Sequence, residues 1–343
     1  MKFKCTQKIY LLCNTGAIGD TVSTFPTIKL LTDRNHIEKM FVADKYIDLY
    51  RIFFDNDLII PMSLAMTVIP PEGITPDIPR HVIDPKTNEA RFLSYPVNPN
   101  IPIVYSLQPL PTSIHSHLID CFSMTICDSI LKDEQKNYPQ VDIVKLPEHP
   151  LLCKEGDKLK DYVVIAYGAT TEHRRMLPKV FNSIKEWFFN NGYQVVLLGK
   201  RDHELFCGNT ITRPTFDNAD FEGCIDLIDI TSLPEALSVI NDAKCIVGLD
   251  NGLIHLAGLT ETPIIAGYTT VDPYYRLPYR HNIKGWSCYT IEPDSNCRYC
   301  QTEAFCTYGI NFLRCNILTK ECQNSLTFDK WLVQLEKWKE NQK

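Results

Sequence analysis

Two parts of this chain alternate short apolar runs with helical patterns, and this alternation limits the fold more than any other feature. The first part has apolar runs at 8–13 and 40–43, and helical patterns at about 23–31 and 46–54. The second part has apolar runs at 162–166, 193–198, 245–249 and 263–268, separated by helical patterns at 178–191, 233–243 and 251–259. Strands that are apolar along their whole length are typical of parallel sheets covered on both faces. The sequence therefore predicts an α/β protein with two Rossmann-like parallel-sheet halves.

A polar stretch with several prolines, at 132–160, separates the two halves and is the predicted linker. We therefore expect an N-terminal domain over 1–150 and a C-terminal domain over 151–343, which fits the size of two ordinary domains. The last predicted helix, 327–341, has large apolar side chains on one face and must dock on other parts of the chain. We expect it to pack back on the first domain.

Charge and hydropathy exclude some protein classes. The net charge is −6, so there is no broad positive surface for a non-specific nucleic-acid binder. No apolar run reaches the roughly 18 residues that a membrane helix needs, and the start shows no small-residue cleavage pattern. We expect a cytoplasmic protein, with peripheral contact to the inner membrane face as a further hypothesis.

The first candidate site is the glycine turn that follows the first predicted strand. It contains Gly16, Gly19 and Asp20, and a helix is predicted to begin near Ser23 with Pro26 in its first turn. Open α/β sheets bind ligands at this carboxyl edge. The glycines do not match the G-x-G-x-x-G dinucleotide pattern, and an acid here would repel phosphate but could accept a proton. The alternative is that Asp20 caps the helix.

The second candidate is the strand–turn–helix element at 245–259. A strand ends at Asp250, and a helix begins at Asn251 and Gly252, so the free amides of its first turn could bind an anion. Gly252 would let a diphosphate approach the backbone, and His255 lies one turn further along. The alternative is that Asp250 and Asn251 cap the helix while His255 is an ordinary buried histidine.

Two further loops are predicted at the same edge of the second sheet. One contains Thr170, Arg174 and Arg175, whose guanidinium groups could neutralise a phosphate leaving group. The other, at 269–278, contains Thr270 together with aromatic residues suited to a nucleoside or a sugar. Each loop taken alone is also compatible with a solvated connection.

Together these segments resemble the heptosyltransferase-like glycosyltransferases of family 9, which have the GT-B fold. The resemblance rests on Ile18-Gly19-Asp20 with Pro26, on Asp250-Asn251-Gly252-Leu253-Ile254-His255-Leu256-Ala257, on 267–273 and on Arg175-Met176-Leu177-Pro178. It is dense in 10–31 and 161–275. This sequence has Asn251 where the family has Ser or Thr, Arg175 for Lys, and Leu177 for Trp.

The resemblance implies two domains facing a central cleft and an inverting transfer from a nucleoside-diphosphate sugar to an acceptor hydroxyl. It implies Asp20 as the general base and Arg175, helped by amides at Asn251 and Gly252, as the group that stabilises the leaving diphosphate. It further implies Gly19, Thr170, Arg174, Asp250, His255 and Thr270 as donor-side residues. No Asp-x-Asp pair lies near these segments, so we expect catalysis without a metal ion.

Five of the fourteen cysteines crowd into 297–322, as Cys297, Cys300, Cys306, Cys315 and Cys322. Four thiolates such as Cys297, Cys300, Cys306 and Cys315 could hold a structural zinc ion, since C-x2-C is a usual first half of such sites. The alternative is a set of reduced thiols packed beneath a loop.

The acceptor has several candidates. Family resemblance implies an oligosaccharide, a lipopolysaccharide core or another lipid-linked glycan. A hydroxymethylated base in DNA is a second hypothesis, which would need a phosphate-tracking patch such as Arg174, Arg175, Arg276, Arg280 and Lys284. Two hypotheses without an acceptor also remain open at this point: a sugar-nucleotide epimerase and a non-catalytic nucleotide-sugar-binding protein.

Overall fold

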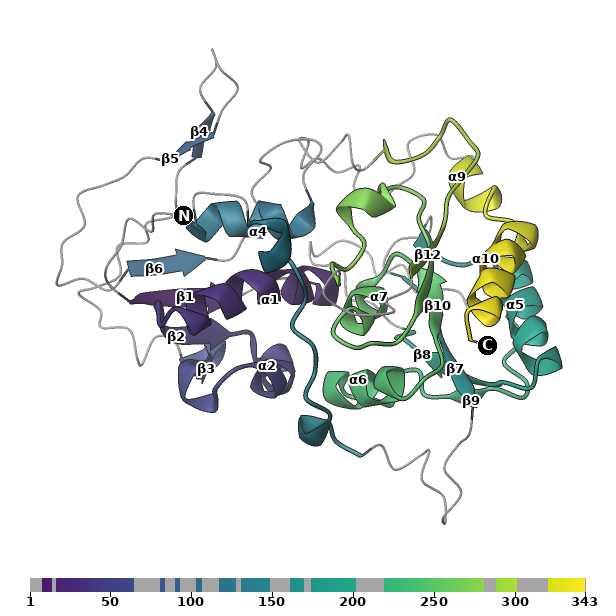
Figure 1. Cartoon of the computed structure of the whole chain (residues 1–343), viewed down its shortest axis with the longest axis horizontal. Coiled ribbons are helices and arrows are strands. Elements are labelled where there is room, and N and C mark those ends of the chain that lie inside the picture. The colour runs from purple at the N-terminus through teal and green to yellow at the C-terminus, as the bar shows by residue number, and fades with distance from the viewer. Residues whose placement is uncertain are drawn as a thin grey trace. The chain divides into compact units, whose positions relative to one another are not determined.

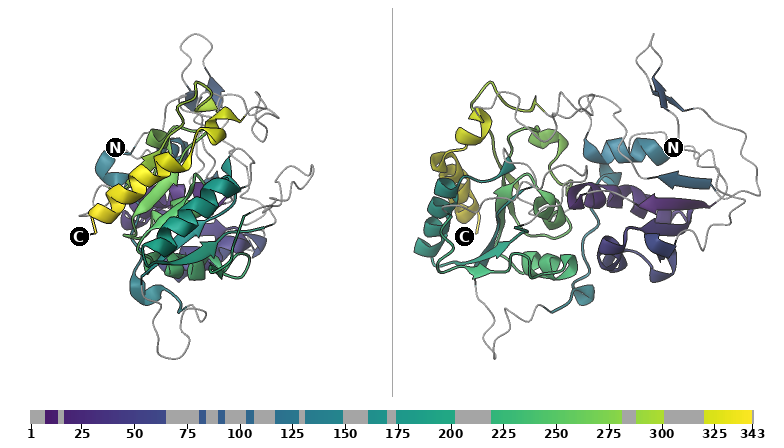
Figure 2. Two further views of the ribbon diagram at one scale, coloured as in Figure 1. Left: turned by 90° about the vertical axis from the view of Figure 1, so that its right-hand side faces the viewer. Right: turned by 180° about the vertical axis from the view of Figure 1, so that it is seen from behind.

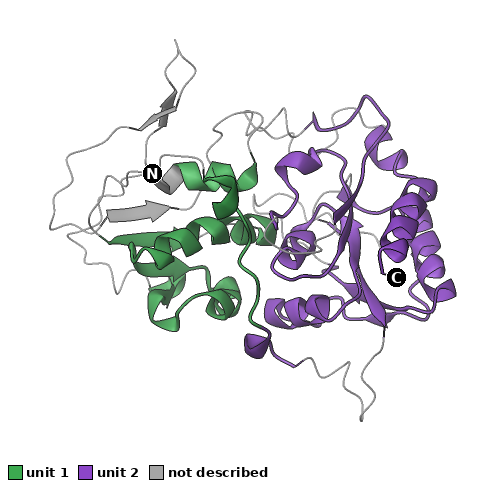
Figure 3. Cartoon of the chain, viewed as in Figure 1, with its two compact units in different colours: residues 1–142 green, residues 143–343 purple. Residues whose placement is uncertain are grey.

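A computed structural model describes the greater part of the chain, in two compact units. The described residues are 8–13, 17–64, 81–83, 90–92, 103–106, 117–127, 131–148, 161–169, 174–201, 219–280, 288–300 and 320–342. Unit 1 comprises residues 1–142 and unit 2 residues 143–343 (Figure 3). The division lies inside the stretch that the sequence indicated as a linker.

Unit 1 is built on a parallel sheet with the strand order β3-β2-β1-β6. These strands are β1 (Ile9–Cys13), β2 (Ile37–Val42), β3 (Ile59–Pro61) and β6 (Ile103–Ser106). The α-helices among its described residues are α1 (Ile18–Asp33), α2 (Ile47–Phe53) and α4 (Leu118–Cys127), and a separate antiparallel pair is formed by β4 (His81–Ile83) and β5 (Ala90–Phe92). The predicted strand–helix alternation of the first half is confirmed.

Helix α1 starts earlier than the sequence indicated. The amide of Thr21 donates to the Ala17 carbonyl at 3.0 Å, so Ala17 is the N-cap and Asp20 lies within the first helical turn. The predicted position of Pro26 in the first turn is therefore wrong, because Pro26 lies inside the helix. Phe25 is fully buried and meets the Tyr50 ring edge-on, with the centroids 5.0 Å apart. Such burial stabilises the helix despite the amide hydrogen bond that proline cannot make.

Unit 2 has a six-stranded parallel sheet with the order β9-β8-β7-β10-β11-β12, which is 3-2-1-4-5-6 along the unit, the order of doubly wound nucleotide-binding folds. The strands are β7 (Tyr162–Ala166), β8 (Gln194–Leu198), β9 (Ile225–Asp226), β10 (Ile246–Leu249), β11 (Ile264–Gly267) and β12 (Cys288–Ile291). Four of the six were predicted. The sequence did not indicate β9, which is very short, or β12, in which buried and half-buried residues alternate.

Helices cover both faces of this sheet (Figures 1 and 2). One face carries α5 (Pro178–Asn190) and α10 (Phe328–Glu340), and the other carries α6 (Leu233–Asn241) and α7 (Gly252–Ala257). Two expected helix starts are confirmed, since Pro178 opens α5 and Ser232 forms a capping box with Glu235 at α6.

The C-terminal helix α10 packs within unit 2. Its buried side chains are Trp331, Leu335 and Trp338, which join a core formed with α5 and the sheet. Gly267 makes this contact close, because a Cβ atom there would lie 2.9 Å from the Trp331 ring and 2.4 Å from a Leu249 methyl carbon. A contact of α10 with the first domain stays a prediction. None of the described helices is long and apolar enough to cross a membrane.

Candidate functional site

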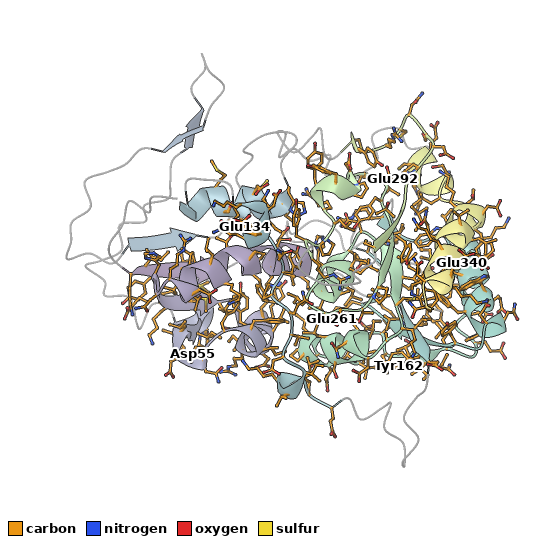
Figure 4. All side chains as sticks on the ribbon, in the orientation of Figure 1. Asp55, Glu134, Tyr162, Glu261, Glu292 and Glu340 are labelled. Carbon is orange, nitrogen blue, oxygen red and sulfur yellow. The ribbon has the colours of Figure 1, made fainter. Side chains whose placement is uncertain are left out.

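The candidate site of unit 2 lies at the carboxyl edge of its sheet. Figure 4 labels Tyr162 at the start of β7 and Glu292 directly after β12. Tyr162 therefore marks the amino edge of the sheet and Glu292 marks the carboxyl edge. Strands β7 and β10 are neighbours, but the chain continues from β7 to β8 on one side and from β10 to β11 on the other. Ligands of open α/β sheets bind beyond the carboxyl ends of two such strands.

Asn251 joins the ends of these two strands. Its Oδ1 accepts hydrogen bonds from the amides of Leu253, at 2.9 Å, and Ile254, at 3.2 Å, which makes it the N-cap of α7. Its Nδ2 donates to the carbonyl oxygens of Ala166, at 3.4 Å, and Gly168, at 3.2 Å. The expectation of freely available amides in this turn is therefore wrong for Leu253 and Ile254, and the capping alternative is confirmed for Asn251 alone.

Asp250 is buried beside Arg174. The Arg174 side chain donates to the Asp250 carbonyl oxygen from Nε, at 2.9 Å, and from Nη2, at 2.7 Å. The same Nη2 lies 2.9 Å from Oδ2 of the Asp250 carboxylate, while only 4% of the Asp250 side chain is exposed. Such a charge-assisted fork fixes the Arg174 loop against the end of β10.

The electrostatics of Asp250 favour its charged form. Burial by itself raises the pKa of this carboxyl, but the charge of Arg174, the contact with His255 and the charge of Arg276 together hold the pKa well below its ordinary value. The Nε2 atom of His255 is 3.5 Å from Asp250 Oδ1, too far for a strong hydrogen bond. Among the described residues, Oδ1 has no hydrogen-bond partner.

Arg175 lies in the same loop but has different partners. Its Nε donates to the carbonyl oxygen of Ala169 at 3.1 Å, and its own carbonyl oxygen accepts a 2.7 Å hydrogen bond from Gln323. Thr270 is buried in the loop after β11. Thr170, a predicted donor-side residue, lies outside the described part of the chain.

Sequence reasoning missed two residues of this region. Arg276 was assigned to a DNA-binding patch, but it is buried and its charge acts on Asp250. Gln323 gave no signal at all, because 148 residues separate it from Arg175. A pattern in the sequence could suggest Arg276, as a cation in a loop after a predicted strand, whereas only the tertiary structure reveals Gln323.

In unit 1, Gly19 and Asp20 lie in the first turn of α1, directly beyond β1. Asp20 is half-buried. Burial raises the pKa of the neighbouring Tyr46 hydroxyl to about 12, although a hydrogen bond with Thr21 lowers it. The charge of Asp20 also raises this pKa. Asp20 is not the N-cap of α1, so the capping alternative is wrong. The carboxylate sits at the carboxyl edge of this sheet, near its switch between β1 and β6.

The cysteine-rich segment is described at its two ends. Cys297 is half-buried, Cys300 is exposed and Cys322 is buried. Cys306 and Cys315 lie outside the described residues. In the part of the chain that is described, no group of three metal-ligating side chains comes together.

The proposed DNA-binding patch has no structural support. Arg280 is fully buried, and its side chain donates to the carbonyl oxygens of Ala257, Thr260 and Thr262. Arg276 is buried as well, and Lys284 lies outside the described residues. Arg280 thus holds the connection between α7 and β11 and is not available to phosphates.

Comparison with known proteins decides the family. The model of glycosyltransferase family 9 (heptosyltransferase) matches residues 125–304, which is more than half of the chain. The chain belongs to glycosyltransferase family 9. This family 9 chain is 28% identical to lipopolysaccharide heptosyltransferase 2 of Salmonella typhimurium over 151 residues. The matched stretch covers 43% of this chain and 42% of that relative. It is 31% identical to lipopolysaccharide heptosyltransferase 2 of Escherichia coli over 105 residues, which are 30% of this chain and 29% of that relative. The chain thus matches less than half of the length of these relatives.

Solved structures share the fold of this family 9 chain. The iron-containing dodecameric glycosyltransferase TibC of enterotoxigenic E. coli has a TM-score of 0.65 at 16% identity, over 99% of this chain and 78% of that chain. The family 9 glycosyl transferase of Veillonella parvula has a TM-score of 0.56 at 13% identity, over 97% of both chains. At such identities the comparison concerns the fold alone, and the predicted GT-B class with Rossmann-like parallel sheets is confirmed.

Proposed function

We propose that this protein is an inverting glycosyltransferase that moves a heptose-type sugar from a nucleoside-diphosphate donor to a glycan hydroxyl. The observation that carries the proposal is the buried Asp250 at the switch point of the unit 2 sheet, with Arg174 fixed beside it and Oδ1 without a hydrogen-bond partner among the described residues. A buried carboxylate oxygen with spare acceptor capacity is suited to a hydroxyl of the donor sugar. A TibC complex is known with ADP-D-β-D-heptose, which makes adenosine diphosphate the first nucleotide to test.

In the proposed mechanism, unit 2 binds the donor and Asp20 of unit 1 takes the proton from the acceptor hydroxyl. That oxygen attacks the anomeric carbon as the bond to the diphosphate breaks, so the configuration inverts. Arg174 and Arg175 stabilise the negative charge that develops on the departing diphosphate. Asp250 holds Arg174 and accepts a hydrogen bond from the sugar, and His255 supports Asp250. Gly19, Gly252, Thr170 and Thr270 are the remaining donor-side candidates.

We infer an acceptor related to the lipopolysaccharide core, because the relatives act in heptose transfer to lipopolysaccharide. A lipid-linked acceptor would bring the protein to the cytoplasmic face of the inner membrane. These chemical steps need no metal ion.

A structural metal in the cysteine-rich segment is a separate proposal. Ser295 donates to the Glu321 carboxylate at 3.1 Å, so the segment with Cys297 and Cys300 lies beside the one with Cys322. Thiolates of this kind suit zinc or iron. We expect about one bound metal ion per purified chain, which elemental analysis measures, and a marked loss of that metal in a Cys297→Ser/Cys300→Ser variant. Metal-free wild-type protein that is folded would contradict the proposal.

The function is tested with a panel of nucleotides and sugar nucleotides. A ligand that is present at a concentration of about 100 times its Kd stabilises the native state by about 2.7 kcal/mol, so thermal shifts identify the donor. Incubation with ADP-heptose and a core-glycan acceptor should then give a glycosylated product. Interconversion of the sugar nucleotide without transfer would indicate an epimerase, and binding without reaction would indicate a binding protein. Either result contradicts the proposal.

A further inference from the structure

The two described ends of the cysteine-rich stretch each contact a loop of the candidate donor site. We call residues 295–300 and 320–324 the buttress. The amide of Tyr299 donates to the Thr269 carbonyl oxygen at 3.0 Å, next to Thr270. The side chain of Gln323 donates to the Arg175 carbonyl oxygen at 2.7 Å. The two parts of the buttress thus contact the two loops that carry donor-side residues.

The buttress is itself anchored in unit 2. Helix α9 (Glu321–Asn324) leads into α10, and its Cys322 is buried. The Glu321 carboxylate accepts a hydrogen bond from Ser295, whose oxygen also accepts one from the Cys297 amide at 3.0 Å. These contacts tie the two parts of the buttress to each other, while Figure 1 shows α9 beside the start of α10.

Gln323 is the part of the buttress that is best placed to act on the donor site. Only 5% of its surface is exposed, so its amide is held in a protein environment. Among the described residues, the Arg174–Arg175 loop is attached through Arg174 to Asp250, through the Arg175 side chain to Ala169, and through the Arg175 backbone to Gln323. Without the hydrogen bond from Gln323, the Arg175 carbonyl is held less firmly and the two guanidinium groups lose preorganisation.

We infer that Gln323 is a positioning residue that sets the diphosphate affinity of the donor site by fixing the backbone of Arg175. This inference rests on the proposed function, because it takes the two arginines as the diphosphate-binding groups. In this inference Gln323 acts through the Arg175 backbone and not through a contact of its own with the ligand. Its effect is therefore expected on the phosphate part of the donor and not on the nucleoside part.

The test is the ratio of the Kd values for AMP and ADP, measured by calorimetry on the full chain. In Gln323→Met, which keeps the length of the side chain but removes the donor, the ADP Kd should rise about five- to tenfold. The AMP Kd should change much less, so the preference for ADP falls. Gln334→Met, the same exchange on α10, is the matched control and should keep the wild-type ratio.

A purely structural role for Gln323 would weaken ADP and AMP by the same factor, and that result would overturn the inference while leaving the proposed function intact. An unchanged ADP Kd would overturn it too. Wild-type protein that binds no nucleoside diphosphate would contradict the proposed function and this inference with it. Should Gln323→Met not fold, Gln323→Asn, which keeps the amide on a shorter side chain, takes the same test with the same expected fall in the ratio.

Discussion

Arg174 and Asp250, 76 residues apart in the sequence, form a fork at the end of β10. Nε and Nη2 of Arg174 donate to the Asp250 carbonyl oxygen at 2.9 and 2.7 Å, and Nη2 also contacts the carboxylate at 2.9 Å. The neighbouring Arg175 does not share this contact, because its Nε donates to Ala169. Two adjacent arginines therefore have different tasks, one tied to the buried carboxylate and one to the loop after β7.

This difference predicts unequal effects on stability. Arg174→Ala leaves the Asp250 carboxylate buried without its partner and should lower the free energy of unfolding by about 3–5 kcal/mol. Arg175→Ala removes the hydrogen bond from Nε to the Ala169 carbonyl and leaves no buried charge unpaired at Asp250, so it should cost about 1 kcal/mol. Urea unfolding of both variants measures the difference. Equal losses would contradict the assignment of the ion pair to Arg174.

The pH dependence that Asp250 gives to the stability of unit 2 should appear only at low pH. The folded-state pKa of this carboxyl lies below its ordinary value of about 3.9. The contribution of its charge is thus complete above about pH 4 and is lost as the pH falls through and below that value. The stability difference between wild type and Asp250→Asn should be constant from pH 8 to pH 5 and shrink towards pH 3. Asp242→Asn, at an exposed acid, serves as the control. A difference that grew towards low pH would exclude a depressed pKa.

Asn251 should be only partly replaceable by Ser. Ser can still cap α7, but it cannot also reach the Ala166 and Gly168 carbonyls that accept from Asn251 Nδ2. We expect Asn251→Ser to lose about 1 kcal/mol of stability and Asn251→Ala about 2 kcal/mol, since Ala also removes the cap. Chemical unfolding checks the order. A Ser variant as stable as wild type would show that the link between β7 and β10 contributes nothing.

Asp20 should be needed for turnover and not for donor binding. Removing a general base slows the reaction by about 10²- to 10⁴-fold, so Asp20→Asn should lose kcat by that factor at an unchanged Kd for the donor nucleotide. Asp33→Asn lies on the same helix at an exposed position, where Asp33 contacts Lys29 at 2.9 Å, and should retain kcat. Near-normal turnover in Asp20→Asn would remove Asp20 from the role of base.

The sequence by itself determined the two parallel sheets, since apolar runs such as 162–166 alternate with helical patterns and are typical of sheets covered on both faces. It also determined which loops lie at the carboxyl edge, and so pointed to Asp20, Arg174, Asp250 and Asn251. The start of α1 was not predictable, because Gly19, Asp20 and Thr21 have turn-like propensities that tertiary burial overrides.

Only the tertiary structure decided the partners of those residues. Local sequence cannot tell which of two adjacent arginines reaches Asp250, because that depends on the directions in which the loop after β7 presents consecutive side chains. Nor can it reveal that Gln323 supports Arg175 or that Arg280 is buried, since each contact joins segments that meet only when the sheet has assembled. Periodicity reports burial along one element, whereas side-chain partnership depends on the packing of several.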